Sequence, residues 1–261
     1  MEAPGLNVER TGEGPPLVLI HGLGASIRSW GPVIPRCATT REVVAVDLPG
    51  FGESPPLPAG VRPTPWALAD AVERELDAAG LERPAIAGNS LGGWIALELA
   101  RRGRAASVVA ISPAGMWTER ERAWADRFLR TLYAVARRLE PHAELVRNPV
   151  ARTLALGAVS ARPWRTDPED AVYGVRALAR SNFLPTHEAM IAERCRGLEE
   201  IACPVLVLWG TRDLLLPLRQ ARRFADRIPG AALRELPGLG HVPMADDADL
   251  VAQALLELSA A

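Results

Sequence analysis

Short runs of apolar, β-prone residues recur along the first half of the chain and return near its end. Each run is bounded by glycine or proline and is largely continuous rather than alternating. Continuous apolar runs are typical of strands that are buried on both faces of a parallel sheet. We therefore predict strands over residues 17–21, 43–47, 84–88, 107–112 and 204–209, with a last strand near 232–236.

Helical patterns lie between several of these runs. Thr64 is a suitable N-cap, Pro65 follows at the first helical position, and Gly80 stands where a C-terminal glycine belongs. Residues 90–102 form the next predicted helix, which Gly103 closes. Strands that alternate with helices indicate an α/β fold with a mostly parallel sheet and right-handed crossovers.

The alternation stops between about residues 116 and 201, where the sequence gives helix signals and no convincing strand. Thr118 and Glu121 form a capping box, Asp167 precedes Pro168 at a second helix start, and Thr186 is a candidate start for a third. We therefore predict a helical insertion. The predicted core comprises residues 1–115 and 202–261, and the insertion comprises residues 116–201.

After the insertion the sheet resumes. A helix is expected from about Pro217 and a final helix over about 247–258. No internal repeat and no low-complexity linker interrupts the pattern.

Composition narrows the possible functions. Of the 261 residues, 48% are hydrophobic, which is enough for a sizeable core. The formal net charge is −1, so we expect no nucleic-acid partner, because phosphate-binding proteins are normally basic. All 30 basic residues are arginine. Because the sequence has no lysine, it can contain neither a Schiff-base lysine nor a P-loop lysine.

The cysteines and the N-terminus point to a cytoplasmic protein. Cys37, Cys195 and Cys203 have neither a CxxC spacing nor an even number, so we expect no zinc site and no disulfide framework. Residues 1–10 lack the features of a signal peptide, and no apolar run has the length of a membrane span. We expect no metal, no cofactor and no membrane partner, while the oligomeric state stays open.

A candidate nucleophile follows the strand predicted at 84–88. Ser90 stands at the centre of Gly88-Asn89-Ser90-Leu91-Gly92, where that strand joins the next helix. A sharp strand-to-helix turn raises such a serine above the sheet, and it requires small residues two positions away on either side. The strand before the pattern and the helix after it make this motif much stronger than the pattern alone.

A serine needs a base, and the base needs an acid that orients it. Asp213 follows the strand predicted at 204–209, and His241 follows the strand predicted at 232–236. Catalytic groups of parallel sheets gather at the carboxyl ends of the strands. We therefore predict Ser90 as nucleophile, His241 as general base and Asp213 as its acidic partner.

The tetrahedral intermediate also needs donors for its oxyanion. The backbone N–H of Leu91 follows the nucleophile at a helix N-terminus. The backbone N–H of Leu23 lies in a loop whose glycines, Gly22 and Gly24, allow the chain to curl. We predict these two N–H groups as the oxyanion hole.

Five motifs together resemble the motif series of the α/β-hydrolase superfamily, in the order of that family: HGLGAS at 21–26, DLPGFGES at 47–54, GNSLGG at 88–93, WGTRD at 209–213 and GHVPMAD at 240–246. The resemblance covers nearly the whole chain apart from the insertion. It implies the α/β-hydrolase fold, a Ser-Asp-His triad, and an insertion that acts as the family's variable cap or lid.

Other polar residues near these motifs have simpler interpretations. We interpret His21 as a structural residue that shapes the oxyanion loop, and Asp47 as a structural carboxylate at a strand end. One of Asp246 and Asp247 is expected to cap the final helix.

Within the insertion, we assign no role to His142 or His187. Aromatic residues in such an insertion more often pack against the core than line a substrate pocket, and we interpret these five as packing residues: Trp117, Trp124, Phe128, Trp164 and Phe183.

The triad predicts acyl transfer to water. Ser90 would attack a carboxylic ester of a small, largely apolar substrate, His241 would transfer the proton, and water would cleave the acyl-enzyme. By resemblance, a serine at the elbow disfavours epoxide hydrolases and haloalkane dehalogenases, which use aspartate there.

Alternatives remain open at this point. The GNSLGG elbow is also similar to that of the meta-cleavage-product hydrolases, which cleave carbon–carbon bonds and in which tryptophan commonly follows the catalytic histidine. Here Val242 follows it. Thioesterase, lactonase and perhydrolase activities fit the same triad, and a non-hydrolytic small-molecule-binding protein is possible because a fold does not fix a function.

Overall fold

A seven-stranded sheet organises residues 5–259, which are the residues that the computed structural model describes. The strand order is β1-β3-β2-β4-β5-β6-β7. β1 pairs antiparallel with β3, and the other neighbouring pairs are parallel. β2 and β4 are neighbours although β3 comes between them in the sequence, so the winding of the chain reverses there. The strands are β1 (Val8–Thr11), β2 (Pro16–Ile20), β3 (Glu42–Val46), β4 (Ala85–Asn89), β5 (Ser107–Ile111), β6 (Val205–Gly210) and β7 (Ala232–Leu236).

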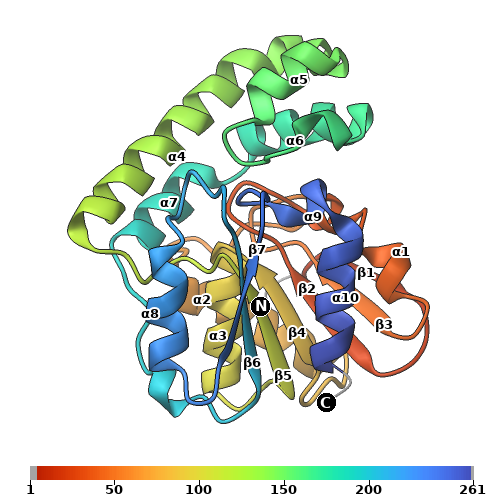
Figure 1. Cartoon of the computed structure of the whole chain (residues 1–261), viewed down its shortest axis with the longest axis vertical. Helices are drawn as coiled ribbons and strands as arrows, with labels where there is room; N and C mark the ends of the chain where they lie inside the picture. Colours follow the sequence, from red (N-terminus) through yellow and green to blue (C-terminus); the bar gives the residue numbers. More distant parts are fainter. Residues whose placement is uncertain (1–4, 260–261) are drawn as a thin grey trace.

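Helices cover both faces of this sheet, as Figure 1 shows. Successive strand residues enter different cores: Val18 packs on one face and Leu19 on the other. Because both faces are buried there, the central strands of the sheet are largely apolar. One face carries α2 (Pro65–Ala78), α3 (Leu91–Arg101) and α8 (Arg219–Arg227), and the other carries η1 (Ile27–Trp30), α1 (Ile34–Cys37), α9 (Pro243–Asp246) and α10 (Ala248–Ser259).

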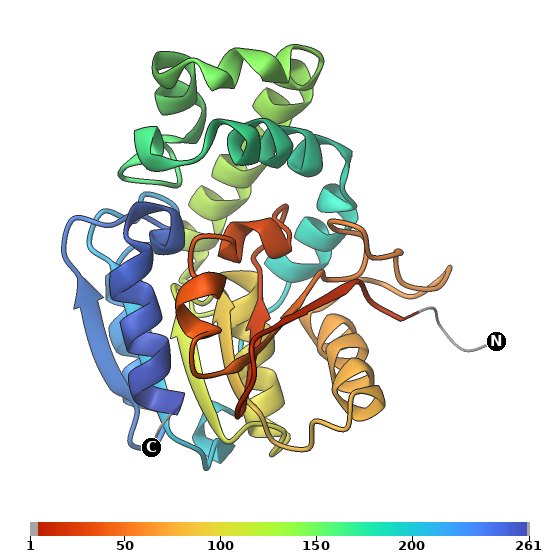
Figure 2. The same cartoon turned by 90° about the vertical axis from the view of Figure 1, so that its right-hand side faces the viewer.

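A block of helices lies over one end of the sheet and is seen in both Figure 1 and Figure 2. We call residues 119–191 the helical segment. Thr118 and Glu121 form the predicted capping box at its start, and Asp167 caps a later helix as predicted. Its elements are α4 (Glu119–Leu139), η2 (Glu140–Arg147), α5 (Pro149–Leu156), η3 (Pro163–Arg165), α6 (Pro168–Arg180) and α7 (Phe183–Ile191), and η4 (Leu198–Glu200) leads back to β6.

Two sequence predictions about the helical segment are wrong. Thr186 does not start a helix: α7 begins at Phe183, and the Thr186 hydroxyl donates to the Asn182 carbonyl inside the first turn. Trp164 is not a packing residue, because 56% of its surface is exposed, whereas Trp117 and Phe183 are buried as expected. Trp124 is 43% exposed, and its indole N–H donates to the Leu214 carbonyl.

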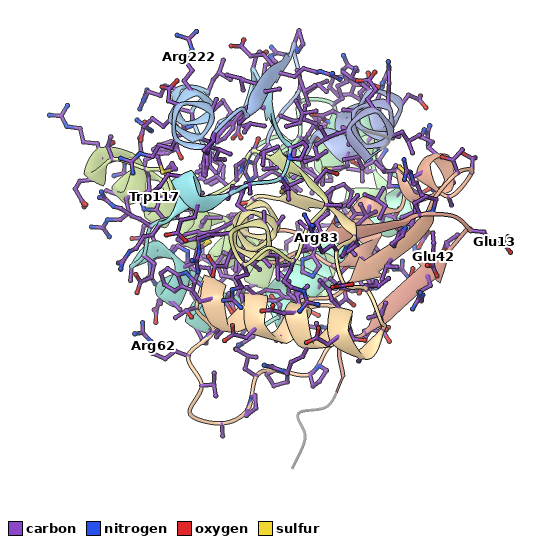
Figure 3. The ribbon with its side chains drawn as sticks, turned by 90° about the horizontal axis from the view of Figure 1, so that it is seen from below. Glu13, Glu42, Arg62, Arg83, Trp117 and Arg222 are labelled. Atoms are coloured by element: carbon purple, nitrogen blue, oxygen red, sulfur yellow. The ribbon has the colours of Figure 1, made fainter. Side chains whose placement is uncertain are left out.

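The rest of the surface is polar and of mixed charge. Seen from the end opposite the helical segment, Arg62, Arg222 and Glu13 project away from the molecule (Figure 3). Over residues 5–259, no helix is both long and apolar enough to cross a bilayer. Over the same residues, no group of three or more His, Cys, Asp or Glu side chains is arranged to hold a metal ion. The three cysteines are free and buried.

Candidate active site

Ser90 lies on the sharp turn between β4 and α3. Its φ of 56° is in the region that disfavours residues with a side chain, at a cost of about 1–3 kcal/mol. Three backbone hydrogen bonds stabilise this conformation. The Ser90 N–H donates to the Ile111 carbonyl (2.9 Å), and the Ser90 carbonyl accepts from the N–H groups of Trp94 and Ala114 (3.1 Å each). The strain is therefore compensated by the strands and the helix around the turn.

The two glycines of the elbow are required by close backbone contacts. A Cβ on Gly88 would lie 2.1 Å from the Gly92 carbonyl oxygen, and a Cβ on Gly92 would lie 2.2 Å from the Ile20 carbonyl oxygen. Both distances are far below van der Waals contact. The sequence pattern Gly-x-Ser-x-Gly therefore follows directly from the way α3 crosses the ends of β2 and β4.

Asp213 and His241 form a buried pair. The Nδ1 of His241 lies 2.7 Å from Oδ2 of Asp213, so this nitrogen donates to the carboxylate. The other oxygen, Oδ1, accepts from the backbone N–H groups of Leu215 (2.9 Å) and Leu216 (2.8 Å). Asp213 is thus fixed on both oxygens, and it bonds to His241 rather than to its neighbour Arg212. This geometry sets the tautomer in which Nε2 of His241 can accept a proton.

Asn89 is a site residue that the sequence analysis does not identify. Its side-chain Nδ2 donates to the carbonyl of His241 (3.0 Å) and to that of Ile111 (3.2 Å). It therefore connects the nucleophile turn to the histidine loop. Its place directly before Ser90 in GNSLG is the only sequence signal for this role.

Asp246 is a second such residue. It is 1% exposed, and its carboxylate accepts from four donors: the Ser160 hydroxyl (2.5 Å) and the backbone N–H groups of Ala161 (3.1 Å), Arg162 (2.8 Å) and Gly240 (2.6 Å). Gly240 directly precedes the histidine. Asp246 therefore connects the histidine loop to the stretch between α5 and η3.

His21 is fully buried and bonded on both ring nitrogens. Nδ1 lies 2.7 Å from the Gly22 carbonyl, and Nε2 accepts from the Leu48 N–H (2.9 Å). Because Nε2 is an acceptor, the proton is on Nδ1. Burial lowers the pKa of His21, and this outweighs the opposing effects of the Gly22 bond and of Asp47. Asp47 in turn accepts from three donors, so both residues anchor the loops beside the site.

The Leu23 loop packs against the nucleophile. A Cβ on Gly22 would lie 3.2 Å from Cβ of Ser90, so these two segments of the backbone are in close contact. Among residues 5–259, the backbone N–H groups of Leu23 and Leu91 have no protein acceptor. Two unpaired donors beside a serine have the chemistry that an oxyanion hole requires.

Ser90, His241 and Leu23 all line one cavity of about 150 Å³, which we call the triad cavity. Larger cavities of about 420 and 570 Å³ occur elsewhere in the described chain, so volume alone does not locate the site. Apolar side chains, mostly from the helical segment, form much of the remaining lining: Leu129, Leu132, Val159, Leu178, Met190, Leu215 and Val242. The triad cavity is therefore small and apolar, with its polar groups at the sheet end.

Comparison with known proteins identifies the family of the chain. The model of the "Alpha/beta hydrolase family" matches residues 17–254. Since this range contains the elbow, the acid loop and the histidine loop, the match includes every predicted triad residue.

Several of the similar proteins are named as hydrolases. The chain is 39% identical to "Epoxide hydrolase EphH" of Mycobacterium tuberculosis over 190 residues, which are 68% of this chain and 86% of the relative. It is 32% identical to the "Pimeloyl-[acyl-carrier protein] methyl ester esterase" of Chromobacterium violaceum over 264 residues, which are 97% of each chain. A solved thermophilic esterase from Thermogutta terrifontis is 26% identical with a TM-score of 0.72, covering 97% of this chain and 92% of that one.

Proposed function

The chain belongs to the α/β-hydrolase family and is a hydrolase, and from that premise we propose that it cleaves a carboxylic ester through an acyl-enzyme on Ser90. The observation that carries this proposal is that His241, which is bonded to the buried Asp213, lines one cavity together with Ser90. Relatives named as esterases support the same reaction.

Each group has one task in the proposed reaction. His241 takes the proton of Ser90 on Nε2 as the serine oxygen bonds to the carbonyl carbon, and the N–H groups of Leu23 and Leu91 stabilise the resulting oxyanion. The imidazolium then gives its proton to the leaving alcohol. Water repeats the sequence on the acyl-enzyme and releases the acid. Asp213 keeps Nδ1 protonated throughout, so Nε2 stays available.

The chemistry of the nucleophile favours an ester over an epoxide. If the Ser90 oxygen opened an epoxide, the product would be an ether, which has no carbonyl for water to attack. An aspartate nucleophile would instead give an ester that water can cleave. The sequence similarity to a protein named as an epoxide hydrolase is therefore support for the family and for hydrolysis, while Ser90 supports the acyl route.

The triad cavity supports a small apolar acyl group. An apolar cavity of about this volume holds one benzene molecule in another protein, so acyl groups of up to about six carbons fit without movement of the helical segment. We propose that the helical segment acts as a cap, because Leu129, Leu178 and Met190 supply much of the apolar lining.

The test is hydrolysis of p-nitrophenyl esters of increasing acyl length. We expect wild-type protein to prefer short acyl groups. Ser90→Ala should lower kcat/KM by about 10³-fold or more, with a nearly unchanged melting temperature. The control is labelling of Ser90 by a fluorophosphonate. Release of p-nitrophenol that survives Ser90→Ala would refute the nucleophile. Labelling without ester turnover would favour carbon–carbon substrates. The absence of both labelling and turnover would favour a binding protein.

A further inference from the structure

Two valines separate the triad cavity from a second, larger cavity. Val242 follows His241, and Val159 lies between α5 and η3, where its carbonyl accepts from the Val242 N–H (3.0 Å). Both residues line the triad cavity, and both also line the cavity of about 420 Å³ between the helical segment and the η1–α9 side of the core. We call this pair of side chains the valine wall.

The chemistry of ester cleavage defines which part of a substrate faces the valine wall. The histidine must protonate the leaving oxygen, so the alcohol part of the ester lies next to His241. The carbonyl oxygen points instead to the N–H groups of Leu23 and Leu91. Because Val242 is bonded covalently to His241 and pairs with Val159, the alcohol is the part of the ester that is directed toward the second cavity.

The second cavity differs from the triad cavity in size and in character. Its volume lies within the range of about 300–1,000 Å³ that is usual for small-molecule sites. Its lining combines apolar residues with charged side chains that are already engaged: Arg28 pairs with Asp170 (3.7 Å), Arg36 pairs with Asp249, and Asp167 accepts from the first N–H groups of α6. A third arginine, Arg165, donates to a backbone carbonyl (3.1 Å).

Paired charges favour one class of ligand. A leaving group with a full charge would have to compete with an existing ion pair for its counter-charge. A neutral group with several hydroxyls can instead donate to the carboxylates and accept from the guanidinium groups without breaking the pairs. The lining of the second cavity is therefore suited to an uncharged polyol.

We infer that the second cavity is the leaving-group subsite, and that the substrate is an ester of a small apolar acid with a larger, uncharged alcohol that carries several hydroxyls. This inference rests on the proposed esterase function. Val159 and Val242 then determine which alcohols are accepted, because both line the triad cavity and the second cavity.

The first experiment keeps the acid constant and varies the alcohol. Butyrate esters of methanol, glycerol and choline are compared with wild-type protein. We expect kcat/KM for glyceryl butyrate to exceed that for methyl butyrate by about tenfold or more, with no such gain for the choline ester. A preference for choline would contradict the neutral polyol, and no preference among the three would contradict the subsite itself.

The second experiment enlarges the side chains of the valine wall. Val159→Trp and Val242→Trp should each lower the ratio of glyceryl to methyl ester kcat/KM by about tenfold. Two positions are used so that poor folding of one variant does not decide the result. Leu154→Trp is the control, because Leu154 is 81% exposed on α5 and lines neither the triad cavity nor the second cavity. The ratio of glyceryl to methyl ester kcat/KM in this variant should equal that of wild type.

The outcomes separate the inference from the function on which it rests. Serine-dependent hydrolysis with an unchanged ratio in both valine variants would overturn the inference alone. A change in the preferred acyl length, with the alcohol ratio unchanged, would assign the second cavity to the acyl chain and would also overturn it. If wild-type protein cleaves no ester in the series, the proposed function fails as well.

Discussion

At the scale of single residues, Asp246 and Asp247 are adjacent in sequence, but their carboxylates have different main partners. Asp247 caps α10 by accepting from the Leu250 N–H (3.2 Å), so it is the expected N-cap. Asp246 instead accepts from both the histidine loop and the stretch at Ser160–Arg162. The carboxylate of Asp247 therefore stabilises a helix end and pairs with Arg162 (3.2 Å), whereas that of Asp246 fixes two loops beside the site.

Asp246→Ala should leave four donors without an acceptor. We expect it to lower the free energy of unfolding by about 3 kcal/mol or more and kcat by roughly 10- to 100-fold, because the His241 loop loses its anchor. Asp247→Ala should cost about 1 kcal/mol as the loss of an N-cap, with a much smaller effect on kcat. Denaturant unfolding and p-nitrophenyl butyrate turnover measure both. Ser160→Ala, which removes one donor, should have an intermediate effect. Equal kcat for the two alanine variants would show that Asp246 has no positioning role.

His187 gives the fold a dependence on pH. Its side chain is buried against Phe183, with Nε2 2.8 Å from Asp126. Burial lowers its pKa more than Asp126 raises it. The unfolded chain therefore binds a proton near pH 6.5, whereas the folded chain does so only at lower pH. Because the unfolded state binds more protons in between, the free energy of unfolding falls as pH decreases below that value.

His187→Phe should reduce this dependence, since phenylalanine retains the ring and does not titrate. The measurement is urea unfolding of both proteins at about pH 7.5 and 5.5. The wild-type protein should lose more stability between the two values than the variant. An equal loss in the two proteins would mean that His187 does not contribute to the pH dependence of the free energy of unfolding.

At the scale of elements, one buried carboxylate helps to attach the start of α4 to the core. Glu121 is buried, closes the capping box by accepting from the Thr118 N–H (2.8 Å), and also accepts from Arg219 and Arg223 of α8. Its interactions therefore join the start of the helical segment to a helix of the core. Glu119, two residues earlier, is exposed and pairs only with other exposed residues, among them Arg122.

Glu121→Gln should lower the free energy of unfolding by roughly 2 kcal/mol, because it removes the charge that the two arginines share. Glu119→Gln is the matched control on the same helix turn and should cost less than about 1 kcal/mol. Thermal or urea unfolding distinguishes them. Similar values for the two variants would indicate that the start of α4 does not depend on this carboxylate.

At the scale of the whole molecule, the sheet is predictable from the sequence and much of its surroundings is not. The buried parallel strands are recognisable because both faces are apolar, and the predicted ends agree with the structure to within about two residues. β1 is missed because its residues Val-Glu-Arg-Thr are mostly exposed and lack that pattern. The site residues at strand ends follow from strand order, so the sequence brings Ser90, Asp213 and His241 to one edge.

The parts of the site that the sequence does not predict depend on contacts across long separations. Asp246 binds a stretch more than eighty residues away, and nothing near it in the sequence signals that partner. Likewise, Val159 lies in an irregular stretch with no periodic pattern, yet it lines the triad cavity. Such features arise from how the helical segment packs on the core, which local pattern does not encode.

The valine wall has a consequence for the direction of the reaction. By microscopic reversibility, an alcohol that departs past Val159 and Val242 can return by the same path and attack the acyl-enzyme. Water and polyols would then compete for the same acyl group, so in concentrated glycerol the protein would act as an acyltransferase and form new esters. The size of these two side chains would thus set the balance between breaking esters and making them.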